Sequence, residues 1–130
     1  MHKSFFHGSA IHFFLRLSVI AGILGLGSIG QAWAHARPET QAPVAGAVVG
    51  APQEVSITYN EGLEPAFSSL VVSNAQGKQV NSAKAEIDAT THKTMRVALP
   101  SLPSGVYQVK WVAVAEDGHR TQGSYKFTVK

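Results

Sequence analysis

The chain is 130 residues long, with 11 Lys and Arg, eight Asp and Glu, six His and no cysteine. Disulfides and thiolate metal sites are therefore excluded, so any metal must be held by histidine, carboxylate or backbone groups. Basic residues do not cluster with aromatic ones, which argues against a nucleic-acid partner.

The first 34 residues are typical of a cleaved secretory signal. Lys3 and Arg16 give a basic start without any acid. An uncharged, glycine-rich apolar run of 14 residues follows at 17–30, shorter than the roughly 20 residues that span a bilayer. The Ala-Trp-Ala segment at 32–34 supplies the small residues of a signal-peptidase site. We therefore expect residues 1–34 to be removed, a membrane anchor being the alternative.

Cleavage after Ala34 leaves 96 residues, enough for one domain with one core and too few for two. The loss of Lys3 and Arg16 leaves nine basic residues against eight acidic ones, so the net charge falls to about +1. The sequence thus predicts one nearly neutral domain at 35–130.

From Val55 onwards, apolar and polar residues alternate, which is typical of β-strands with one buried face. Strands are predicted at 55–59, 69–73, 94–99, 106–113 and 124–129, separated by Pro-, Gly- and Asn-rich turns. Tyr107 follows a Leu-Pro-Ser-Gly corner and Trp111 lies two inward positions further on, as in immunoglobulin-like cores. We predict an all-β domain, a single antiparallel Greek-key sandwich or barrel, with 42–52 as an extended edge strand.

Three histidines remain after cleavage, and His35 becomes the first residue. A free N-terminal histidine offers its α-amine and its imidazole Nδ1 to one metal ion, closing a chelate ring without help from the fold. The α-amine has a pKa of about 7.7–8.0, so copper(II) can displace its proton near neutral pH. Copper(II) also prefers nitrogen-rich, tetragonal sites. We interpret His35 as a copper(II) ligand, the alternative being that a histidine follows the cleavage site by coincidence.

Asp117-Gly118-His119 lies between the last two predicted strands. Asp-Gly is itself a strong hairpin signal, so a purely structural role for Asp117 stays open. Two residues apart in a tight turn, Asp117 and His119 can present a carboxylate oxygen and an imidazole to the same side. With His35 they would supply an amine, two imidazoles and a carboxylate, which suits copper(II).

Three other residues could carry metal chemistry. Glu61 follows the strand at 55–59 and precedes a glycine, so it is either an axial or outer-sphere oxygen ligand or the start of a turn. His92 lies in a polar loop beside a lysine and is interpreted as solvated surface. Met95 holds an inward strand position, where core packing is favoured over a thioether ligand.

In their order and spacing these segments resemble the CopC family of bacterial periplasmic copper-binding proteins, including its short stand-alone members. The resemblance covers nearly all of residues 35–130, although no single motif carries it. Its parts are the His-Ala start at 35–36, the proline-bounded approach at 43–52, the strand and Phe-Ser loop at 55–68, the segment at 99–111, the Asp-Gly-His turn at 117–119 and the last strand at 123–130.

The resemblance implies a cupredoxin-like or immunoglobulin-like β-barrel that holds copper(II) through the His35 amine and imidazole, Asp117 and His119. Glu61 falls at the position of an additional acidic ligand in some members. Residues 73–85 lack the methionines of the family's copper(I) loop, so copper(II) alone is expected. The family often works beside, or fused to, a CopD-type inner-membrane protein, which for this chain is expected to be a separate polypeptide.

The expected function is that of a periplasmic copper(II) carrier, buffer or delivery factor in copper homeostasis and resistance, without enzymatic activity and not membrane-spanning in its mature form. One alternative is an oxidase similar to polysaccharide monooxygenases, which also bind copper through an N-terminal and a second histidine but need an open coordination position. The other is a metal-free immunoglobulin-like assembly domain. Binding of one equivalent of copper(II) separates this last alternative from the other two.

Overall fold

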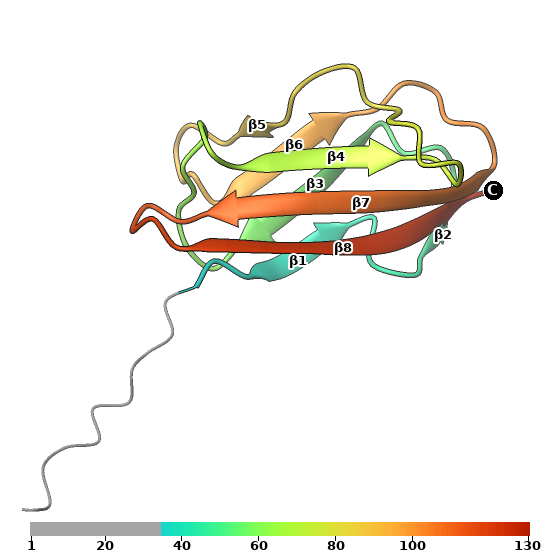
Figure 1. The fold of residues 1–130 in the computed structure, drawn as a ribbon. Coiled ribbons are helices and arrows are strands. Elements are labelled where there is room, and N and C mark those ends of the chain that lie inside the picture. The colour runs from blue at the N-terminus through green and yellow to red at the C-terminus, as the bar shows by residue number, and fades with distance from the viewer. Residues whose placement is uncertain (1–34) are drawn as a thin grey trace, which may run out of the picture. The chain divides into compact units, whose positions relative to one another are not determined.

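The computed structural model describes residues 35–130, and the predicted signal at 1–34 lies outside the described residues. Eight strands form two four-stranded sheets that face each other (Figure 1). In chain order they are β1 (Pro38–Ala42), β2 (Val48–Val49), β3 (Glu54–Tyr59), β4 (Ser69–Ser73), β5 (Glu86–Ile87), β6 (Thr94–Ala98), β7 (Gly105–Val114) and β8 (Arg120–Val129). The described part of the chain forms no helix, and hence none long and apolar enough to cross a membrane.

The strand order is β1-β3-β6-β5 in one sheet and β2-β8-β7-β4 in the other. Neighbouring strands are antiparallel except β2, which runs parallel to β8. Strands distant in sequence therefore lie side by side, as in the Greek-key pairing of an immunoglobulin-like sandwich. The prediction of an all-β Greek-key fold is confirmed, and the two separate sheets make it a sandwich.

The core lies between the sheets and is built from the alternating residues of each strand. Val55, Ile57 and Tyr59 of β3 are fully buried, as the period-two pattern predicts. Met95 of β6 is also fully buried, which confirms core packing. At the start of β7 the hydroxyl of Tyr107 donates to the carbonyl of Pro103 at 2.7 Å, which ties the strand to the preceding corner.

The segment 42–52 does not form the single edge strand that was expected. β1 ends at Ala42, and β2 covers only two residues at the edge of the other sheet. Pro43 has no N–H to continue the first ladder, and Gly46 turns the chain with a φ of 77°. The Gly46 N–H then donates to the carbonyl of Lys126 at 2.7 Å on β8. The segment therefore crosses from one sheet to the other.

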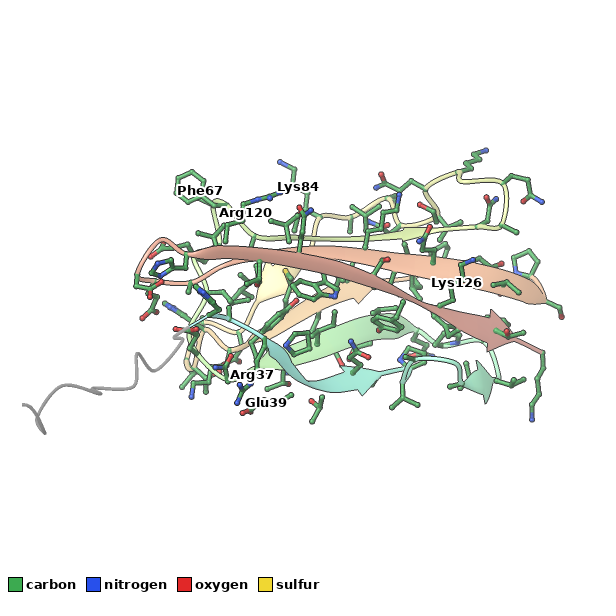
Figure 2. All side chains as sticks on the ribbon, turned by 60° about the horizontal axis from the view of Figure 1, so that its bottom comes forward. Arg37, Glu39, Phe67, Lys84, Arg120 and Lys126 are labelled. Atoms are coloured by element: carbon green, nitrogen blue, oxygen red, sulfur yellow. The ribbon has the colours of Figure 1, made fainter. Side chains whose placement is uncertain are left out.

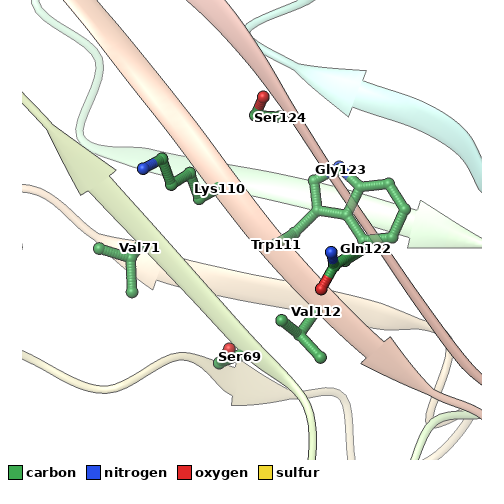
Figure 3. Close-up of a pocket in the computed structure, with 8 residues that line it drawn as sticks. All are labelled: Ser69, Val71, Lys110, Trp111, Val112, Gln122, Gly123 and Ser124. Carbon is green, nitrogen blue, oxygen red and sulfur yellow. The ribbon is translucent and has the colours of Figure 1, made fainter.

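Trp111 points inward, as predicted, but is only half-buried. Its partner across the β7–β8 ladder is Gly123, and a Cβ atom at that glycine would lie 2.5 Å from the indole Cζ2. The indole meets the ring of Tyr59 edge to face, with centroids 5.6 Å apart. The hollow beside the indole contains Lys110 and Gln122 but no histidine or carboxylate among its lining residues (Figure 3).

Charged side chains point away from the sandwich and come from several strands and loops. Figure 2 labels five of them: Arg37, Glu39, Lys84, Arg120 and Lys126.

Candidate metal centre

Three segments meet at one end of the sandwich: the start of β1, the end of β3 and the hairpin between β7 and β8 (Figure 1). The Asn60 Oδ1 accepts the N–H of Arg37 at 2.8 Å, and the Asn60 N–H donates to the Arg37 carbonyl at 3.2 Å. The hydroxyl of Thr121 on β8 donates to the carbonyl of Ala36 at 2.6 Å. Both sheets therefore hold the residues that directly follow His35.

This arrangement brings His35 beside His119, although the two are 84 positions apart in the chain. Their ring centroids are 5.0 Å apart and the ring planes make an angle of 73°. The Nδ1 atom of His35 is shielded from solvent, whereas the side chain of His119 is 59% exposed. His35 is thus half-buried with its Nδ1 covered, whereas the His119 side chain lies mostly in solvent.

Asp117 lies against His119 through two contacts. Its Oδ1 accepts the backbone N–H of His119 at 3.0 Å, and its Oδ2 lies 2.8 Å from the ring Nδ1. The hydrogen bond from the His119 ring, then that from its backbone, then the charges of His119 and His35, lower the pKa of the Asp117 carboxyl. Gly118 has a φ of 89° and donates its N–H to the carbonyl of Ala115 at 2.8 Å, so the predicted Asp-Gly turn also forms.

Glu61 lies two residues beyond the end of β3 and is half-buried. Its Oε1 is buried and has no hydrogen-bond partner among the described residues. A buried carboxylate oxygen that lacks a donor is costly, and a bound cation would compensate it. This supports the oxygen-ligand interpretation of Glu61 over that of a plain turn residue.

The structure brings His35, Asp117 and His119 together, and among the described residues none of the hydrogen bonds of Asp117 or His119 goes to Glu61. Within residues 35–130, no group of three or more histidine, aspartate or glutamate side chains is arranged to hold a metal ion as it stands. The Nδ1 of His119 is engaged by Asp117, and in the 130-residue chain the backbone nitrogen of His35 is part of a peptide bond.

Sequence reasoning missed two participants at this end of the sandwich. Thr121 anchors the His35 segment from an inward position of β8, which the strand alternation could have indicated. His92 is exposed, as expected, but it is not merely solvated: its Nδ1 lies 3.2 Å from Oε1 of Glu116. Glu116 directly precedes Asp117, and that adjacency was the available signal.

Chemically, this end offers two imidazoles, an ionised carboxylate and a second carboxylate with an unpartnered oxygen. Nitrogen and oxygen donors of this kind suit a divalent transition metal in a tetragonal geometry, for which copper(II) has the highest affinity. The residue types present therefore suit a divalent transition-metal ion.

Comparison with known proteins gives a consistent set of similarities. The CopC domain profile matches residues 38–130. Protein YobA of Escherichia coli K12 is 37% identical over 100 residues, covering 75% of this chain and 81% of that protein. Copper resistance protein C of Escherichia coli is 31% identical over 123 residues, covering 89% and 98%.

Solved structures show the same similarity. The crystal structure of CopC from Methylosinus trichosporium OB3b superposes with a TM-score of 0.69 at 33% identity, covering 74% of this chain and 94% of that one. PcoC, a methionine-rich copper resistance protein from Escherichia coli, superposes with a TM-score of 0.68 at 32% identity, covering 75% and 100%.

Proposed function

The chain belongs to the CopC family, and from this premise we propose that residues 35–130 form an exported copper(II)-binding protein that carries, buffers or delivers copper in the periplasm. Relatives named as copper resistance proteins support the copper function. An inner-membrane protein of the CopD type would be its partner.

The proposed ligands are the amine and imidazole of His35, the imidazole of His119 and the carboxylate of Asp117, with Glu61 as an additional acidic ligand. The observation that carries this proposal is the 5.0 Å approach of the His35 and His119 rings, with Asp117 against the second ring. No other described pair of histidine rings is in contact. If these donors filled the coordination plane of copper(II), no position would remain for oxygen activation, and we therefore propose carriage without catalysis.

The N-terminal amine is the ligand that depends on signal removal. When the peptide bond before His35 is cut, its nitrogen becomes an amine with a pKa of about 7.7–8.0, which copper(II) can deprotonate near neutral pH. An amide nitrogen at the same position is not basic enough to bind copper in this way. Tight copper binding would then be confined to the processed protein.

The experiment compares copper(II) affinity in three proteins: the mature chain that starts at His35, the same chain with one extra N-terminal residue, and His119→Ala. We expect the extra residue to weaken binding at least about 100-fold, more than the typical cost of losing a group that merely orients a ligand. His119→Ala should cause a similar loss. Equal affinity of the extended and the mature chain would show that the amine is not a ligand and would refute the proposed site.

A further inference from the structure

A second imidazole–carboxylate pair lies outside the ligand set described above. His92, in the loop between β5 and β6, places its Nδ1 3.2 Å from Oε1 of Glu116 at the end of β7. The side chains are 44% and 58% exposed, so both are accessible from solvent. An exposed contact of this kind contributes little to stability.

The backbone holds His92 in an unusual conformation. Its φ is 55°, in the left-handed region that residues other than glycine rarely adopt. Its N–H donates to the carbonyl of Asp88 at 2.9 Å, and its own carbonyl accepts the N–H of Leu63 at 2.9 Å. Both backbone groups are thus used, and together they direct the imidazole towards Glu116.

Glu116 is held just as closely. Its N–H donates to the carbonyl of Gly62 at 3.1 Å. A Cβ atom on Gly62 would lie only 2.7 Å from Oε1 of Glu116, so the absence of a side chain at residue 62 leaves the space that this carboxylate occupies. The Glu116 carboxylate therefore lies between Gly62 and His92, with its side chain 58% exposed.

The separation of the two donor atoms also suits a shared metal ion. With metal–ligand bonds of about 2.0–2.2 Å, two adjacent ligand atoms lie roughly 2.8–3.5 Å apart, depending on whether the angle between the bonds is square or tetrahedral. The Nδ1–Oε1 distance of 3.2 Å falls in this interval. We propose that His92 and Glu116 form a second copper(II) position, whose remaining ligands are water.

This position is separate from the His35 site and weaker. Along the hydrogen-bonded backbone, His92 contacts Leu63, Leu63 pairs with Ala115, and Ala115 donates to the carbonyl of His119. Among the described residues, neither His92 nor Glu116 makes a side-chain hydrogen bond or ring contact with His119, so the two imidazole–carboxylate pairs are distinct. Two protein ligands instead of four or more make the bound ion readily exchangeable.

The test is a titration of the mature chain with copper(II) beyond one equivalent. Binding is monitored by calorimetry and by the copper-induced broadening of histidine NMR signals. We expect a tight first equivalent that broadens His119 and a weaker second one that broadens His92. His92→Asn should weaken the second equivalent more than tenfold and leave the first unchanged. Asparagine tolerates a positive φ, so this variant keeps the loop conformation.

Two further variants make the result specific. Glu116→Gln should also weaken the second equivalent, whereas Glu86→Gln on β5, an exposed carboxyl outside the pair, should change neither. His119→Ala should weaken the first equivalent about 100-fold and keep the second, so the two sites can fail independently. A second equivalent that survives His92→Asn unchanged, or a wild-type chain that binds only one copper ion, would overturn the proposal and leave His92 and Glu116 as an ion pair only.

Discussion

Replacing Glu61 by alanine should change the stability of the metal-free and the copper-loaded protein in opposite directions. In the metal-free protein, Oε1 of Glu61 is buried and has no hydrogen-bond partner among the described residues. Such a group destabilises the fold, so its removal stabilises it. In the copper-loaded protein the same oxygen is the proposed additional ligand, and its removal weakens copper binding.

The magnitudes follow from these two roles. A buried polar group without a partner costs about 1–3 kcal/mol, and since Glu61 is only half-buried we take the lower end, about 1 kcal/mol. For a domain of this size, that corresponds to a rise in Tm of roughly 4–8 °C in the metal-free state. A tenfold loss of copper affinity would reduce the stabilisation by saturating copper by about 1.4 kcal/mol.

Thermal unfolding monitored by circular dichroism, with a chelator and then with one equivalent of copper(II), measures both effects. Glu64→Ala is the matched control, because it removes a half-buried carboxyl from the same loop. We expect this control to leave the copper-induced increase in Tm unchanged. A Glu61→Ala protein with a lower metal-free Tm and an unchanged copper-induced increase would refute the reasoning, because the carboxylate would then have a structural partner and no role towards copper.

Two other predictions concern the core and the pH dependence of stability. Gly123→Ala should destabilise the domain by about 1–3 kcal/mol and alter Trp111 fluorescence, because the new Cβ atom would lie 2.5 Å from the indole. The control Gly50→Ala adds a Cβ atom with no other atom within 4 Å and should change stability by less than about 0.5 kcal/mol. Equal unfolding midpoints for the two variants would contradict this prediction. Burial raises the pKa of Tyr125 to about 12 and, with the charge of Tyr125 as a second cause, raises that of Tyr59. Because the folded pKa values lie above the unfolded value of about 10, the contribution of these tyrosines to the free energy of unfolding is complete below pH 10 and is lost as the pH rises towards 12. In urea unfolding, Tyr125→Phe should make this loss with pH shallower. Parallel plots of unfolding free energy against pH for the wild-type and variant proteins would contradict the prediction.

The strands were predictable because each has one buried face. Residues such as Ile57 and Phe127 occupy every second position, and the structure buries them as the alternation indicates. Where no such alternation exists, prediction failed: the small apolar residues at 42–52 gave no sign that Gly46 would turn the chain towards the other sheet. The turn at this single glycine sends the chain from one sheet to the other, and the composition of the segment does not reveal that turn.

In the candidate site, too, local contacts could be predicted from the sequence, whereas long-range contacts could not. The contact between Asp117 and His119 is local, so a turn signal and a two-residue spacing were enough to predict it. The contact between His92 and Glu116 joins loops 24 positions apart, and it depends on the pairing of Leu63 with Ala115 and on the absence of a side chain at Gly62. Contacts of this kind follow from the register of the sheets, which the sequence pattern alone does not determine.

The anchoring of Ala36 separates the positioning of the His35 imidazole from the formation of its free amine. Ala36 is fully buried, and its carbonyl accepts a hydrogen bond from the hydroxyl of Thr121 at 2.6 Å. The position of the His35 imidazole beside His119 is therefore set by the fold of residues 35–130. Signal removal would then add only the amine, and the unprocessed protein should bind copper(II) weakly through the two imidazoles. On this argument, folding orients the ligands and processing sets the affinity, which would couple copper loading to export without any conformational change.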